Sequence, residues 1–140
     1  MNVVNPHQYK EDAEVLYNEG AVSSAISTIA TALNADYQDE LPILLSVMNG
    51  AAYFTGQLLP HLDFPLALDY VHATRYQGGV EGKVVRWIVE PKAEIKNRSV
   101  LILDDILDEG VTLKSVVDAC HALGAKQVKV AVLVDKALNK

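Results

Sequence analysis

Four carboxylates lie within six positions of a short segment, residues 100–113, which reads VLILDDILDEGVTL. These acids are Asp104, Asp105, Asp108 and Glu109. Carboxylate oxygens accept hydrogen bonds from sugar hydroxyls and coordinate Mg²⁺, directly or through water. The glycine and hydroxyl residues that follow predict a turn into a helix, where backbone N–H groups favour a phosphate. The segment therefore predicts a site for a phosphorylated sugar with a divalent cation.

The same acids also have a purely structural explanation. Carboxylates near the first turn of a helix stabilise it by about 0.3–1 kcal/mol each, because they face the positive end of the helix dipole. One or two acids are enough for that purpose, whereas this segment holds four. Their number at the exit of an apolar run favours a ligand site.

Apolar runs and helical spacing predict the elements that position this segment. We expect strands at 42–48, 66–73, 84–89, 100–103 and 128–134, and helices at 11–34, 51–59 and 112–123. Short, nearly continuous apolar runs are typical of strands buried on both faces. The alternation of strands and helices predicts an α/β fold, a mostly parallel sheet flanked by helices. In such sheets ligands bind beyond the carboxyl ends of the strands, where the acidic segment lies.

Composition narrows the class of protein. The chain has 140 residues, of which 50% are hydrophobic and 21% charged, and we expect one domain over 1–140. We find no apolar stretch of the roughly 18 residues that a membrane span needs and no secretory signal. The single cysteine, Cys120, suits a reducing compartment and falls on the apolar face of a predicted helix. A net charge of −6 argues against nucleic-acid binding. We therefore expect a cytoplasmic protein with no membrane or nucleic-acid partner.

The acidic segment resembles the phosphoribosyl diphosphate (PRPP) signature of the type I phosphoribosyltransferases. Three further segments resemble, in the same order, the hypoxanthine-guanine phosphoribosyltransferase branch: LSVMNGA at 45–51, LDYVHATRY at 68–76 and VLVDK at 132–136. The resemblance covers about residues 40–140. It implies the type I fold with an incomplete hood, because relatives continue beyond the point where this sequence stops.

The resemblance implies an activity. Members of this branch transfer the phosphoribosyl group of PRPP to N9 of a 6-oxopurine, hypoxanthine or guanine. The products are inosine or guanosine monophosphate and pyrophosphate, the cofactor is Mg²⁺, and the reaction serves purine salvage. It also implies a homodimer or homotetramer. The preference among hypoxanthine, guanine and xanthine stays open.

The family pattern implies roles for the acidic segment. Asp104 and Asp105 match the pair that binds the ribose hydroxyls and helps to organise Mg²⁺. Asp108 matches the carboxylate beside purine N7, the candidate general acid/base. The loop around the 5′-phosphate comprises Asp108, Glu109, Gly110, Val111 and Thr112. Because a carboxylate repels phosphate, we expect the Glu109 side chain to point outward while its backbone N–H donates.

Three other matches complete the implied site. Met48, Asn49 and Gly50 match the pyrophosphate loop, and we expect a non-proline cis peptide between Met48 and Asn49. An ordinary tight turn after a strand explains Asn49 and Gly50 equally well from these residues alone. Arg75 and Tyr76 match the start of the flexible lid. Lys136 matches the lysine that donates to purine O6.

Two other functions fit parts of the sequence. A non-catalytic regulator that senses PRPP or nucleotides would use the same fold, but Asp108 and Lys136 match residues that serve the base and so favour an enzyme. A phospho-signalling receiver domain also has an acidic pair after a buried strand, near its N-terminus. Here only 35 residues follow Asp105, and Asp135 is the one later acid at a predicted strand end. The receiver interpretation is therefore disfavoured.

Overall fold

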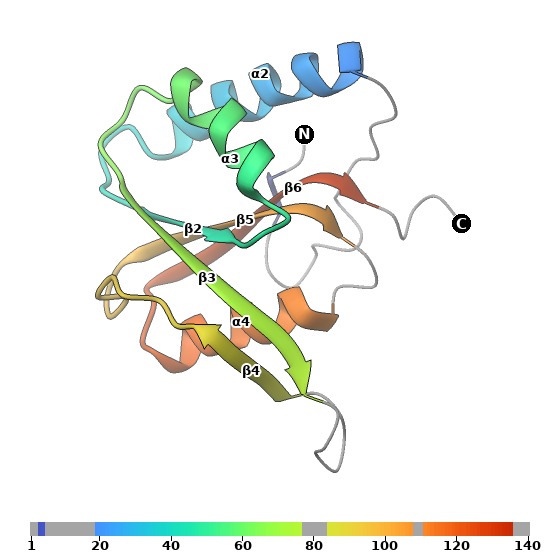
Figure 1. The fold of residues 1–140 in the computed structure, drawn as a ribbon. Helices are drawn as coiled ribbons and strands as arrows, with labels where there is room; N and C mark the ends of the chain where they lie inside the picture. The colour runs from blue at the N-terminus through green and yellow to red at the C-terminus, as the bar shows by residue number, and fades with distance from the viewer. Residues whose placement is uncertain (1–2, 5–18, 77–83, 108–110, 136–140) are drawn as a thin grey trace.

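The computed structural model describes residues 3–4, 19–76, 84–107 and 111–135. Its centre is a six-stranded sheet with the order β1-β6-β5-β2-β3-β4 (Figure 1). The strands are β1 (Val3–Val4), β2 (Ile43–Val47), β3 (Ala67–Tyr76), β4 (Val84–Val89), β5 (Ser99–Leu107) and β6 (Gln127–Asp135). The three central pairs are parallel, and only the outer pairs β1–β6 and β3–β4 are antiparallel. The predicted α/β fold with a mostly parallel sheet is confirmed.

Helices cover both faces of the sheet. They are α2 (Glu19–Asp36), α3 (Ala52–Leu58), the 3₁₀ helix η1 (Leu59–His61) and α4 (Val111–Ala122). Figure 1 shows α2 and α3 on one face and α4 on the other. The chain therefore has two apolar layers with the sheet between them. Within the described residues, every helix is too short or too polar to span a lipid bilayer.

Burial on both faces explains why the sequence of the central strand β2 is apolar at nearly every position. Ile43 and Leu45 pack in the core beneath α4, where Cys120 of that helix is also buried. Leu44, between them, packs on the opposite face with Ile29 of α2. A strand that is buried on both faces has no position for an exposed polar side chain. The predicted burial of the Cys120 thiol is confirmed.

Two strands are longer than their apolar runs predict. We expected a strand at 100–103 that ends before the acids, but β5 continues to Leu107 and so contains Asp104 and Asp105. The reason is its neighbour: β6 runs on to Asp135, and pairing continues from Asp104 opposite Val132 to Leu107 opposite Asp135. Similarly, β3 continues to Tyr76 because β4 pairs with it.

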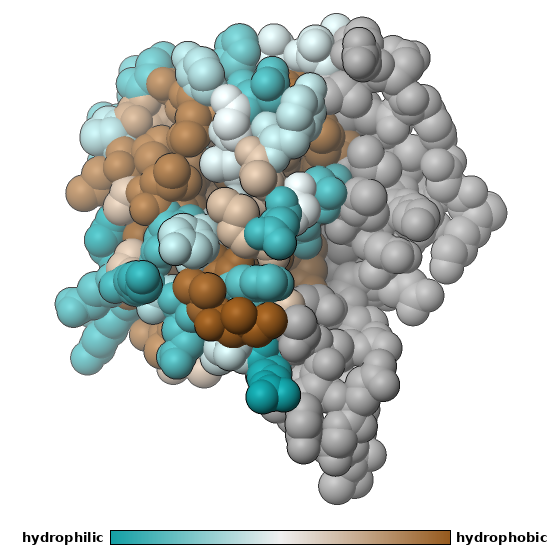
Figure 2. Space-filling model, in the orientation of Figure 1, coloured by the Kyte–Doolittle hydropathy of each residue, from teal (hydrophilic) through white to brown (hydrophobic). Residues whose placement is uncertain are grey.

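The outer strands leave apolar surface exposed. Leu68 and Tyr70 of β3 and Ile88 of β4 are large apolar or aromatic side chains with 53%, 43% and 56% of their surface exposed. Figure 2 shows apolar side chains on the viewer's side of the molecule, where β3 and β4 lie in Figure 1. A surface of this kind suits contact with another protein.

Candidate active site

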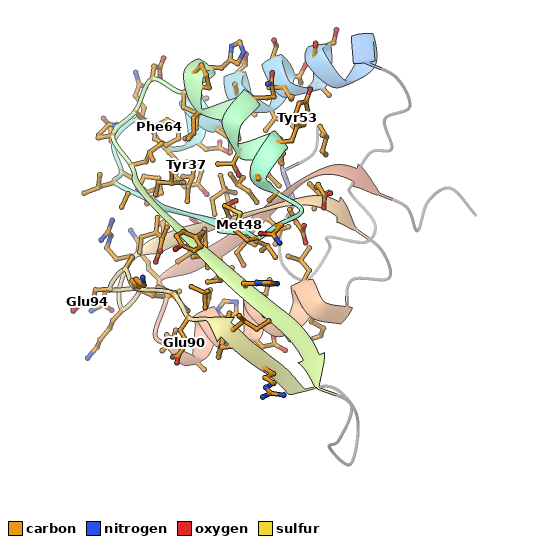
Figure 3. The ribbon with its side chains drawn as sticks, in the orientation of Figure 1. Tyr37, Met48, Tyr53, Phe64, Glu90 and Glu94 are labelled. Carbon is orange, nitrogen blue, oxygen red and sulfur yellow. The ribbon has the colours of Figure 1, made fainter. Side chains whose placement is uncertain are left out.

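The loop between β2 and α3 lies at the carboxyl end of the central strand. Its Met48–Asn49 peptide bond is cis, as the family resemblance implies. The Met48 N–H donates to the Val71 carbonyl of the neighbouring strand at 2.8 Å, and the Ala51 N–H donates to the Val47 carbonyl at 2.9 Å. These bonds fasten the loop to β3 and close it on itself. Figure 3 shows Met48 near the end of β2, on the side of α3.

The same loop meets the acidic end of β5. A Cβ atom added to Gly50 would lie 2.7 Å from Oδ1 of Asp105 and 3.1 Å from its Cγ. Real Cβ atoms essentially never lie so close to an oxygen, so a side chain at position 50 would require the Asp105 carboxylate or the loop to move. The two segments with the strongest sequence signals are thus in direct contact.

Strand geometry separates the two acids. Successive side chains of a strand point to opposite faces. Ile102 of β5 packs beneath α4 and Leu103 beneath α2 and α3, so Asp104 continues the first row and Asp105 the second. Asp105 is therefore on the face that carries α3 and the Gly50 loop. The Asp105 N–H also donates to Oδ1 of Asp104 at 2.8 Å.

Burial changes the acidity of this pair. It raises the pKa of Asp104 to about 8, and the neighbouring carboxyl of Asp105 adds to the increase. The Asp105 N–H works in the opposite direction, since it stabilises the charged form. A bound cation, or a ligand with hydroxyl groups, would stabilise the charged forms of these two neighbouring carboxyls.

The acidic pair fits one type of metal site. Among the residues that the structure describes, no three His, Cys, Asp or Glu side chains are grouped so that they could enclose a metal ion. Mg²⁺ does not need such a cage, because it keeps several waters and takes further oxygens from substrate phosphates. Asp104 and Asp105 therefore fit a magnesium ion whose other ligands would be water and phosphate oxygens of a bound ligand.

The raised pKa of Asp104 predicts a pH-dependent stability. Since the ordinary pKa is 3.8 and the folded value about 8, the carboxyl binds its proton more tightly in the folded state. Stability from this group is therefore full below pH 3.8 and lost as the pH rises toward 8. Asp104→Asn removes this loss, so in metal-free buffer its unfolding free energy should exceed that of the parent by about 1–3 kcal/mol at pH 8 and by much less at pH 4.

Urea unfolding across this pH range measures the difference. Asp39→Asn makes the same change at an exposed turn position and serves as the matched control. A stability difference between Asp104→Asn and the parent that stays constant from pH 4 to pH 8 would contradict the prediction.

The remaining predicted residues are placed in part. Arg75 and Tyr76 are the last two residues of β3 and pair with β4, and Val111 and Thr112 are the first two residues of α4. The other four, Asp108, Glu109, Gly110 and Lys136, lie outside the described residues, as does the expected outward direction of the Glu109 side chain.

The register of the sheet places the ends of β5 and β6 side by side. Leu107, which precedes Asp108, pairs with Asp135, which precedes Lys136, at the ends of parallel strands β5 and β6. The chain therefore leaves the sheet toward Asp108 and toward Lys136 at neighbouring points.

Sequence reasoning missed one polar pair near the loop. Ser46 of β2 and Thr55 of α3 are 1% and 6% exposed, and their hydroxyl oxygens are 2.8 Å apart. The one signal was a serine inside an otherwise apolar run, ILLSV. Its partner in α3 cannot be recognised from that run.

A cavity at the other end of the sheet is a weaker candidate for ligand binding. It has a volume of about 410 Å³ and is lined by Glu40, Leu41, Asn97, Arg98, Ser99 and Lys126. Its polar groups already bond to one another: Arg98 donates to the Leu41 carbonyl at 2.8 Å, and the Ser99 hydroxyl donates to Glu40 at 2.6 Å. The carboxyl ends of the strands remain the better candidate.

Comparison with known proteins agrees with this geometry. The sequence model of the phosphoribosyl transferase domain matches residues 12–139. The chain is 32% identical to the hypoxanthine-guanine-xanthine phosphoribosyltransferase of Tritrichomonas foetus, over 90% of this chain and 69% of that protein. It is 31% identical to the hypoxanthine-guanine phosphoribosyltransferase of Bacillus subtilis, over 91% of this chain and 72% of that protein.

Solved structures show the same similarity. A hypoxanthine phosphoribosyltransferase from Staphylococcus aureus superposes with a TM-score of 0.80 at 30% identity, over 88% of this chain and 67% of that one. The segments that contain the predicted site residues, from Met48 to Lys136, lie within the region that the domain model matches.

Proposed function

Because the chain belongs to the phosphoribosyltransferase family, we propose that it transfers the phosphoribosyl group of PRPP to N9 of hypoxanthine or guanine in purine salvage. The nucleotide and pyrophosphate are the products. The contact between Gly50 and Asp105 carries this proposal, because it joins the loop for the diphosphate to the acids for the ribose. No observation favours a non-catalytic regulator.

The acidic pair binds and orients the sugar. As pyrophosphate leaves, positive charge develops at the anomeric carbon of the ribose. With Mg²⁺ beside them to stabilise their charged forms, Asp104 and Asp105 would accept hydrogen bonds from the ribose hydroxyls and place negative charge near that carbon. Fixed charges of this kind stabilise a transition state because they need no reorganisation during the reaction.

The diphosphate lies against the β2–α3 loop. Asn49 and Gly50 are exposed at the surface of this loop, next to the Asp105 carboxylate. Mg²⁺, held by Asp104 and Asp105 through water and by oxygens of PRPP, would neutralise part of the negative charge of the diphosphate. The 5′-phosphate is bound at the other end of the ribose by residues 108–112, at the start of α4.

Two residues that follow β5 and β6 in the sequence, Asp108 and Lys136, recognise and activate the purine. Asp108 takes up or stabilises the proton at N7 as N9 becomes nucleophilic, a role typical of a general acid/base. Lys136 donates to O6 of a 6-oxopurine. An ammonium group has no acceptor for the amino group of adenine, so hydrogen-bond polarity disfavours that base.

The lid, the assembly and the location complete the proposal. Arg75 and Tyr76 begin a lid that closes over PRPP and excludes water, which would otherwise hydrolyse it. Residues 1–140 form one domain of a cytoplasmic protein that assembles as a homodimer or homotetramer. The exposed apolar side chains on β3 and β4 support the assembly.

A direct assay tests the proposed function. The protein is incubated with PRPP, Mg²⁺ and hypoxanthine, guanine or adenine, and nucleotide formation is followed by chromatography. We expect inosine and guanosine monophosphate but no adenosine monophosphate. Binding of PRPP without turnover of any base would contradict an enzyme and favour a regulator.

Lys136→Ala tests how the base is recognised. Loss of the donor to O6 should raise KM for hypoxanthine about tenfold or more and leave KM for PRPP nearly unchanged. Lys92→Ala, at an exposed position between β4 and β5, is the matched control and should behave as the parent does. A change in KM for PRPP instead would show that Lys136 does not contact the base.

A further inference from the structure

The hydroxyl pair of Ser46 and Thr55 has a place that suggests more than packing. Ser46 is the residue before the last in β2, and Thr55 lies in the middle of α3. The loop of residues 48–51 connects these two elements. The pair therefore joins the strand that leads into the loop to the helix that leads out of it.

The surroundings of the pair are apolar. The same face of the sheet carries Leu44, Phe54, Leu58 and Leu103, all of them fully buried. Buried hydroxyl groups need hydrogen-bond partners, and the 2.8 Å bond supplies one to each residue. Because a hydrogen bond is directional, it fixes the position of α3 relative to β2 more narrowly than apolar contact does.

The pair is also close to the acidic end of β5. Ser46 pairs with Leu103 in the parallel register, and Asp105 is the next residue of β5 on that same face. Gly50 packs so closely against Asp105 that a Cβ atom at position 50 would lie 2.7 Å from Oδ1 of Asp105. A small shift of α3 against β2 would therefore move the loop against the Asp105 carboxylate.

We propose that Ser46 and Thr55 are positioning residues, whose hydrogen bond holds the 48–51 loop in the place where it receives the diphosphate of PRPP. This inference rests on the proposed function. The pair does not contact the substrate. It acts through the loop, so its loss should weaken the binding of PRPP and leave the binding of the purine unchanged.

Thr55→Val tests this role, since valine keeps the shape of threonine and removes the hydroxyl. We expect KM for PRPP to rise about tenfold, with KM for hypoxanthine changed less than about twofold. Ser46→Ala, which removes the other hydroxyl, should give the same pattern. Thr55→Ser, which keeps the hydroxyl, should bind PRPP nearly as tightly as the parent does.

Thr31→Val is the matched control. Thr31 is exposed on α2, where its hydroxyl donates to the Ser27 carbonyl at 3.0 Å, so the variant also loses a hydroxyl hydrogen bond. Its kinetic constants should equal those of the parent. Melting temperatures of all variants separate a loss of stability from a loss of positioning.

Two results would overturn the positioning role. One is a lower melting temperature in Thr55→Val and Ser46→Ala with both KM values unchanged, and the other is an equal rise in KM for PRPP and for hypoxanthine. The dissociation constant for PRPP, measured by calorimetry, tests the pair without turnover. Absence of turnover by the parent protein would count against the proposed function alone, because the calorimetric comparison of the variants would still stand.

Discussion

Gly50→Ala is expected to lower kcat/KM for PRPP by about 100-fold or more. The new Cβ would lie 2.7 Å from Oδ1 of Asp105, so either the carboxylate or the loop must move. Displacement of a binding group by about 1 Å is enough for a loss of this size. The atoms in the way are the end of a side chain, which can rotate, so we expect the melting temperature to change little. Steady-state kinetics and thermal unfolding of the same samples measure both quantities.

Gly56→Ala is a close control for this substitution. Gly56 lies in α3, one turn beyond the loop, and nothing lies within 4 Å of the Cβ that alanine would add. Alanine in a helix is favoured over glycine by about 0.5–1 kcal/mol. This variant should therefore be as active as the parent and slightly more stable. Equal activity of Gly50→Ala and Gly56→Ala would contradict the role of the contact with Asp105.

The sequence predicted the parts of the fold that depend on local pattern. The apolar run of residues 43–47 becomes a strand because both of its faces are buried, and such burial leaves a clear mark in the residue types. The acids of β5 are also visible in the sequence, since four carboxylates lie within six positions directly after an apolar run. The positions of these features, and their chemistry, follow from short stretches of chain.

Features that depend on distant partners were not predictable. The extension of β5 through Asp104 and Asp105 follows from pairing with β6, a partner that the residue types of this segment do not identify. The fit of Gly50 against Asp105 depends on the relative position of two neighbouring strands. The partner of Ser46 is likewise set by the way in which α3 packs on β2. Each of these is a contact between segments, and each determines the geometry of the site.

Asp108→Asn is expected to reduce kcat by about 10²–10⁴-fold, the usual contribution of a general acid or base. Asparagine has nearly the same shape as aspartate but cannot take up the proton from the purine. The dissociation constant for PRPP should stay close to that of the parent, because the ribose hydroxyls are bound by Asp104 and Asp105. Single-turnover kinetics and calorimetry measure the two effects separately.

Glu109→Gln makes the matched change at the neighbouring residue. If the Glu109 side chain points away from the 5′-phosphate, its neutralisation should leave both kcat and the affinity for PRPP nearly unchanged. The pair of variants thus separates proton transfer by one carboxylate from the general effect of removing a negative charge near the phosphate, which would appear in both. Equal kcat values for Asp108→Asn and the parent would mean that Asp108 does not take up the proton of the purine. Another residue near the ends of β5 and β6 would then have to serve as the general base.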